Sequence, residues 1–139
     1  MVRLALIGAG NHSGLNHAPA LGKYAADHPD LLELAAVCDL DRSKAESFAV
    51  SYGFKSVYTD YRKMLEEKNL DGCVCVMPIA LIADLAEDLM RRKMPTTVEK
   101  PMGETLAEVD RLLATARETG TPNMVSVNRR FEPLLRRGY

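Results

Sequence analysis

A glycine-rich turn near the N-terminus is the first segment whose residue types point to chemistry. It reads Gly8-Ala-Gly10-Asn-His-Ser-Gly14 and follows a short apolar run. Gly8 permits a tight turn, Gly10 lets the backbone approach a pyrophosphate, and Gly14 allows the next helix to pack closely on the strand. The N–H groups at the start of that helix would face the phosphates. We therefore predict a dinucleotide site with contacts from Gly8, Gly10, Asn11, His12, Ser13 and Gly14.

A carboxylate further along the chain strengthens this interpretation. The turn is one residue longer than Gly-x-Gly-x-x-Gly, with Ser13 where the third glycine would fall, and a glycine pattern alone also fits a plain tight turn. Asp39, however, ends the second apolar run, where a carboxylate can accept both ribose hydroxyls of an adenosine. Arg42 follows shortly and either contacts a 2′-phosphate or faces water. We predict NAD as the cofactor, with NADP as the less favoured alternative.

The histidines and cysteines show no spacing typical of a metal site. His12, His17 and His28 are not paired with cysteines at ligand spacing, and we interpret His17 as a helix-packing residue rather than a base. Cys73 and Cys75 fall on the same face of a predicted strand, because side chains alternate along a strand. We interpret both cysteines as core residues and predict no metal.

Short apolar runs alternate with helical stretches along the chain. Strands are predicted at residues 2–7, 33–38, 55–58, 73–77, 96–98 and 124–127. Helices are predicted at residues 15–26, 41–52, 60–68 and 79–93, and a last one runs from a capping box of Thr105 and Glu108 to Gly120. This alternation forms right-handed β-α-β units and a parallel sheet. We therefore predict the α/β class, a doubly wound, mainly parallel six-stranded Rossmann sheet with helices on both faces.

Further markers favour one family over the methyltransferases that also combine a glycine-rich turn with an acid after the second strand. The most specific marker is Val98-Glu99-Lys100-Pro101, which a methyltransferase has no reason to show. The sequence resembles the glucose–fructose oxidoreductase and inositol dehydrogenase family, Gfo/Idh/MocA, from Val2 to about Pro133. The other markers, in order, are Gly8-Ala-Gly10, His17, Val37-Cys-Asp39, Thr59-Asp60-Tyr61, Asp71-Gly-Cys-Val-Cys-Val-Met-Pro78 and Asn128-Arg129-Arg130-Phe131-Glu-Pro133.

The resemblance implies an activity and assigns roles to residues. Members of this family typically move a hydride between NAD(P) and a carbinol carbon of a sugar, cyclitol or similar polyol. Lys100 would then be the catalytic residue, reaching the nicotinamide and the reacting hydroxyl, where a cation can stabilise alkoxide charge or pass a proton. Glu99 would hold the geometry of the tripeptide. Met77 and Pro78 would lie beside the cofactor, at the carboxyl ends of the strands.

Two departures from the family pattern and the length of the chain leave a second interpretation open. Ile79 and Ile82 stand where the family commonly has Asn and His, which removes hydrogen-bonding groups near the nicotinamide ribose. We assign residues 1–127 to the dinucleotide-binding domain and residues 128–139 to the start of a linker into a second domain that this chain lacks. The alternative function is therefore a non-catalytic nucleotide-binding module or a truncated fragment that retains only the fold.

Composition and charge narrow the class of protein. Hydrophobic residues make up 47% of the 139 residues and charged residues 27%, which suits one globular domain. The 18 basic residues nearly balance the 19 acidic ones, so no global field would draw the protein to nucleic acid or membrane. No secretory signal is recognisable, and the cysteines are typical of a reduced core. We predict a cytoplasmic homo-oligomer that acts on a small-molecule sugar or polyol.

Overall fold

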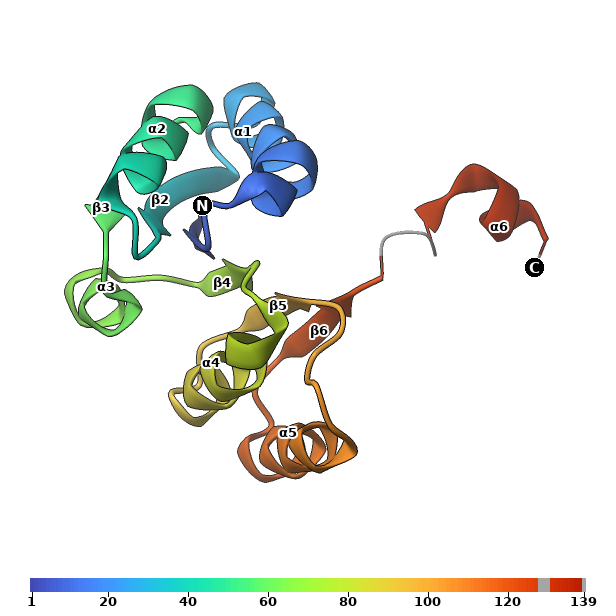
Figure 1. The fold of residues 1–139 in the computed structure, drawn as a ribbon. Coiled ribbons are helices and arrows are strands. Elements are labelled where there is room, and N and C mark those ends of the chain that lie inside the picture. The colour runs from blue at the N-terminus through green and yellow to red at the C-terminus, as the bar shows by residue number, and fades with distance from the viewer. Residues whose placement is uncertain (128–130, 139) are drawn as a thin grey trace.

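A single parallel sheet organises the structure, a computed structural model that describes residues 1–127 and 131–138 (Figure 1). The strands lie in the order β3-β2-β1-β4-β5-β6, and every neighbouring pair is parallel. The chain therefore starts in the middle of the sheet, builds one half outward to β3 and then crosses back to build the other half. The strands are β1 (Val2–Ile7), β2 (Leu32–Cys38), β3 (Val57–Tyr58), β4 (Gly72–Cys75), β5 (Thr96–Glu99) and β6 (Asn123–Ser126).

Helices cover both faces of this sheet. In Figure 1, α1 and α2 lie together on one side and α4 and α5 on the other, while α6 lies away from the sheet. This arrangement confirms the predicted doubly wound Rossmann fold. The helical elements are the π-helix η1 (Ser13–His17), then α1 (Ala18–Asp27), α2 (Arg42–Tyr52), α3 (Tyr61–Glu67), α4 (Ile79–Arg91), α5 (Leu106–Thr119) and α6 (Pro133–Arg137).

The core consists of two clusters, one on each face of the sheet. Along β1, Ala5 and Ile7 belong to the cluster under α3, α4 and α5, whereas Leu6 belongs to the cluster under α1 and α2. Cys73 and Cys75 both lie in the first cluster, as expected for alternate residues of one strand. The three cysteines at positions 38, 73 and 75 are buried and free. The interpretation of Cys73 and Cys75 as core residues is therefore confirmed.

Local signals in the sequence place most helix ends. Asp41 caps α2 by accepting hydrogen bonds from the backbone N–H groups of Ser43 and Lys44. Thr105 and Glu108 form the predicted capping box of α5. Gly53 and Gly120 follow α2 and α5 in the left-handed conformation that glycine adopts without strain. These caps confirm the predicted ends of both helices.

One expectation needs correction. The first helix does not start at residue 15 as one α-helix, because a π-helix precedes α1 and absorbs the extra residue of the glycine turn. On α5 only Leu112 of the apolar positions is fully buried, whereas Leu106 and Leu113 are 83% and 46% exposed. This helix packs against α4, and much of the rest of its surface is exposed. None of the described helices is long and apolar enough to span a membrane.

Candidate cofactor and catalytic site

The glycine turn leaves the carboxyl end of β1, where a Rossmann fold binds its cofactor. Gly8 has a φ of 102°, and a Cβ atom on it would lie 2.0 Å from the carbonyl oxygen of Val76. Its N–H donates to the carbonyl of Cys38 at 2.8 Å. The chain can therefore make this turn only with glycine at position 8.

Gly10 and Gly14 have different roles from Gly8. A Cβ atom on Gly10 would meet nothing within 4 Å, so the space beside it is free for a ligand. A Cβ atom on Gly14 would lie 3.2 Å from the Phe48 ring of α2. The close packing expected at Gly14 is therefore against helix α2, not against the strand.

The extra residue of the turn changes which side chains face outward. Ala18 donates its N–H to the carbonyl of Ser13, five residues earlier, which closes a π turn. Ser13 is fully buried, and its hydroxyl has no hydrogen-bond partner in the described part of the chain. Because the whole residue is buried, neither the side chain nor the backbone of Ser13 is open to a cofactor in this structure, and Ser13 lines neither of the cavities beside the turn.

Asp39 fastens the glycine turn to the second strand. Its Oδ2 accepts a hydrogen bond from the N–H of Ala9 at 2.7 Å, and its Oδ1 accepts one from the N–H of Asp41 at 2.9 Å. Each carboxylate oxygen has a second lone pair, so the side chain can still accept a ribose hydroxyl. The sequence did not indicate that Asp39 also fixes the turn itself.

A cavity of about 580 Å³ opens beside this carboxylate, within the size range of small-ligand sites. Asn11 lines a second cavity of about 710 Å³. The two cavities share Gly10 and Lys44 as lining residues, so they are neighbours at the turn. The predicted cofactor residues that line the first cavity are Gly8, Gly10, Asp39, Met77 and Pro78.

Arg42 does not line either cavity. Its Nε donates to Oε1 of Glu46 at 2.8 Å on the exposed surface of α2. Lys44 lines both cavities instead, and Arg62 lines the one beside Asp39. Two cations that the sequence analysis did not single out, Lys44 and Arg62, therefore line the cavity beside Asp39, and Arg42 does not.

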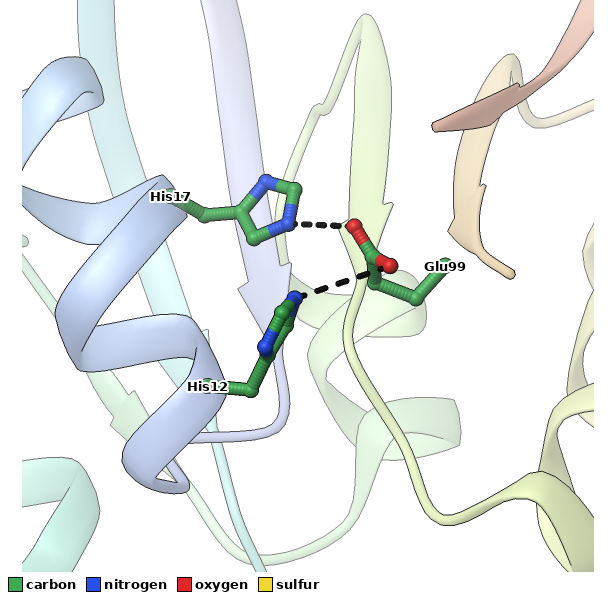
Figure 2. Close-up of side chains that lie close together, drawn as sticks. All are labelled: His12, His17 and Glu99. Atoms are coloured by element: carbon green, nitrogen blue, oxygen red, sulfur yellow. Dashed lines mark hydrogen bonds and ion pairs between the residues drawn. The ribbon is translucent and has the colours of Figure 1, made fainter. Parts of the chain in front are cut away.

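The other predicted functional residues lie at the carboxyl end of β5. Glu99 is only 8% exposed, and its Oε1 lies 2.7 Å from Nε2 of His17 (Figure 2). Its Oε2 lies 3.6 Å from Nε2 of His12 and accepts a hydrogen bond from the backbone N–H of Lys100 at 3.2 Å. Glu99 therefore ties the glycine turn to the Glu-Lys-Pro tripeptide.

The charge of Glu99 follows from these contacts. Burial alone would raise its pKa, but hydrogen bonds from Ser126 and His17 and the nearby imidazole of His12 hold the pKa of Glu99 below its usual range. The carboxylate is therefore ionised at neutral pH. Lys100, by contrast, is exposed at the same edge of the sheet. The ionised carboxylate of Glu99 is thus followed in sequence by the exposed ammonium group of Lys100, which a ligand can reach.

Sequence reasoning did not find the contact between the two histidines and Glu99. His12 and His17 are five residues apart, which would place them on different sides of an α-helix, and Glu99 is 82 residues further on. The π turn brings both rings toward Glu99 in Figure 2. The available signal was the extra residue between Gly10 and Gly14.

Ile82 and Ile79 occupy positions where the family pattern has polar residues. Ile82 is 1% exposed in the core and cannot contact a cofactor, whereas Ile79 is 37% exposed at the start of α4. The marker residues Asn128, Arg129 and Arg130 lie outside the described residues.

Known proteins resemble this chain over nearly its whole length. An inositol 2-dehydrogenase from Rhizobium meliloti is 32% identical over 132 residues, which are 95% of this chain and 38% of that protein. A 4-carboxy-2-hydroxymuconate-6-semialdehyde dehydrogenase from a Sphingobium species is 28% identical over 95% of this chain and 40% of its own length. The solved structure of a Gfo/Idh/MocA family oxidoreductase from Vibrio cholerae superposes with a TM-score of 0.88 at 25% identity, covering 99% of this chain and 42% of that one.

The chain thus spans about two fifths of the length of these relatives. Residues 2–128 match the family described as an oxidoreductase family with an NAD-binding Rossmann fold. This match covers the glycine turn, Asp39 and the Glu-Lys-Pro tripeptide, and it excludes the methyltransferase alternative. The chain belongs to the Gfo/Idh/MocA oxidoreductase family and forms its NAD-binding Rossmann domain.

Proposed function

We propose that this domain binds NAD(H) for the transfer of a hydride to or from a carbinol carbon, with Lys100 as the catalytic residue. The observation that carries the proposal is the contact of Glu99 with His12 of the glycine turn and with the backbone of Lys100. It joins the predicted pyrophosphate site to the predicted reaction site at one edge of the sheet.

Different residues of the domain would bind the cofactor and stabilise the reacting oxygen. The free space beside Gly10 and the carboxylate of Asp39 would hold the pyrophosphate and the adenosine ribose. A bound nicotinamide would supply the hydride acceptor or donor. Glu99 would fix the main chain from which Lys100 extends, and the Lys100 ammonium would stabilise negative charge on the carbinol oxygen.

The substrate class is proposed from relatives. The inositol 2-dehydrogenase from Rhizobium meliloti is named for a cyclitol, and a 28% identical relative from Paraburkholderia graminis is named D-apiose dehydrogenase. We therefore propose a sugar, cyclitol or similar polyol. A cytoplasmic location is part of the proposal, supported by the three free, buried cysteines.

We also propose that catalysis needs groups beyond this domain. A hydride-transfer site must hold the carbinol against the nicotinamide and exclude water, but Lys100 is exposed to solvent. The purified 139-residue chain should therefore bind NADH without measurable polyol oxidation. Robust turnover by a chain whose mass confirms its end at Tyr139 would contradict this.

We also propose that this domain self-associates through the edge of its sheet. β6 pairs with β5 alone among the described strands, and Met124 on this strand is 49% exposed. An unpaired edge beside apolar side chains favours pairing with a second copy. Sedimentation velocity should show a species larger than the monomer, and a monomer at high concentration would contradict the proposal.

A non-catalytic nucleotide-binding module is the second candidate. Ile79 and Ile82 favour it, because neither can donate a hydrogen bond near the nicotinamide ribose. The two candidates differ in polyol turnover once the groups beyond this domain are supplied. The oxidoreductase then turns over polyols, and Lys100→Ala abolishes turnover but keeps NADH binding, whereas the module shows no turnover in any form.

Titration of NADH fluorescence tests cofactor binding in both cases. Gly10→Val should weaken binding at least tenfold, because the added side chain fills space that the structure leaves free for the pyrophosphate. Gly138→Val is the matched control, since the nearest heavy atom to its Cβ would lie 3.7 Å away, far from the turn. Equal binding by the wild type and Gly10→Val would overturn the assignment of the turn.

A further inference from the structure

We propose that His12, His17 and Glu99 form a binding site for a divalent transition metal ion of the zinc type. One ligand atom from each residue lies within 4.8 Å of the other two. His12 lies in the glycine turn, His17 is the last residue of the π-helix η1, and the carboxylate comes from the end of β5 (Figure 2). No spacing in the sequence indicated such a site.

The distances fit a small rearrangement around a metal ion. Bonds of about 2.1 Å in tetrahedral geometry place neighbouring ligand atoms about 3.4 Å apart. The separations between Glu99 and the two histidines are 2.7 Å for His17 and 3.6 Å for His12, one shorter and one longer than this. Rotations of the side chains alone can therefore open the cluster enough for an ion.

The choice of donor atoms selects the kind of metal. Two imidazole nitrogens and one carboxylate oxygen suit zinc and its neighbours, whereas magnesium and calcium prefer oxygen ligands alone. Three protein ligands leave a fourth position open. The side chain of His12 is 51% exposed, so this open position faces solvent at the carboxyl edge of the sheet.

Both imidazoles of the cluster face the same carboxylate. Nε2 of His17 lies 2.7 Å from Oε1 of Glu99. His12 is a second imidazole aimed at the same carboxylate. A dication would use both imidazoles in their neutral form together with the carboxylate.

The surroundings of the cluster can orient the ligands. The side-chain nitrogen of Asn16 lies 3.3 Å from Nδ1 of His12 and also donates to the backbone carbonyl of His12 at 3.0 Å, which restricts the movement of this ligand. The Ser126 hydroxyl also interacts with Glu99 and helps to keep the pKa of this carboxyl below its usual range.

The backbone near the cluster has two unfavourable features that a functional site would explain. The segment that positions both histidines is a π-helix, which is rare and frequent at functional sites. It also buries the hydroxyl of Ser13 with no partner among the described residues. In a regular α-helix the two rings would not face the same carboxylate.

Binding of Zn²⁺ and Co²⁺ to chelator-treated protein tests the site without cofactor or substrate. Calorimetry should give one Zn²⁺ per chain, and Co²⁺ should give a four-coordinate visible spectrum without sulfur-to-metal charge transfer. Each of His12→Ala, His17→Ala and Glu99→Gln should weaken binding by at least roughly tenfold. His28→Ala is the control, because His28 is exposed and lies outside the cluster, and it should bind like the wild type.

Thermal melts distinguish a metal site from a cluster that holds only protons. Zn²⁺ should raise the melting temperature of the wild type and Mg²⁺ should not, and His12→Ala should lose this shift. If the other variants fail to fold, His12→Ala still tests the proposal, because the half-exposed side chain of His12 contributes little to the core. No binding at micromolar Zn²⁺, equal binding by His12→Ala, or sulfur ligation in the Co²⁺ spectrum would each overturn the proposal. NADH is absent throughout, so none of these results depends on the proposed oxidoreductase activity.

Discussion

The two ends of the cofactor-binding edge are held in different ways. At the β1–β2 end, the backbone itself sets the geometry: Gly8 has a conformation open only to glycine, and Asp39 accepts from the N–H of Ala9. At the β4–β5 end, side chains from distant segments hold one another, with Glu99 bound to His17 82 residues earlier. The first end should therefore respond to any change of backbone shape, and the second to changes of charge and hydrogen bonding.

Gly8 is the position where a substitution should cost most. Gly8→Ala should destabilise the fold by about 3 kcal/mol or more, because its Cβ would lie 2.0 Å from a carbonyl oxygen at a φ of 102°. Gly10→Ala, with nothing within 4 Å of its Cβ, should change stability by less than about 1 kcal/mol. Urea denaturation measures both. Equal losses would show that the turn is not fixed at Gly8.

A smaller loss is expected at Asp88, which helps to hold the β4–β5 half together. Burial would raise its pKa, but hydrogen bonds from Tyr61 at 2.7 Å and Arg92 at 3.0 Å lower it below the ordinary value of 3.8. Asp88→Asn should cost about 1 to 2 kcal/mol at neutral pH.

The sign of the pH dependence follows from the lowered pKa. The stability that ionised Asp88 contributes is present above pH 3.8 and is lost as the pH falls through its folded-state pKa. The gap between wild type and Asp88→Asn should therefore close in acid. Asp84→Asn is the control on the same helix, and its exposed ion pair with Arg111 should contribute under about 1 kcal/mol. A gap that persists below the folded-state pKa would contradict the assignment.

The choice between NAD and NADP should depend only weakly on any single cation. Lys44 lines both cavities beside the turn, whereas Arg42 pairs with Glu46 away from them. Lys44→Ala should weaken NADPH binding about fivefold, near 1 kcal/mol, and leave NADH binding nearly unchanged. Arg42→Ala should alter neither. Competition titrations would contradict this if Arg42→Ala had the larger effect on NADPH.

The two ends also differ in how far the sequence predicts them. The strands, the capping box at Thr105 and the role of Gly8 follow from local patterns, because each depends on residues a few positions apart. The contact of His17 with Glu99 depends on a π turn and on packing across 82 residues, which no local spacing encodes. The side-chain direction of Arg42 was likewise open, since an exposed arginine is placed by its ion-pair partner.

In the proposed function, one dinucleotide spans both ends of this edge. Amide chemical shifts measured by NMR test this directly, by comparing NAD with ADP-ribose, which lacks the nicotinamide. We expect both ligands to shift the amides of Gly10 and Asn11, and only NAD to shift the amide of Lys100 as well. Identical patterns for the two ligands, with Lys100 unmoved by NAD, would contradict the placement of the reaction site at the Glu-Lys-Pro tripeptide.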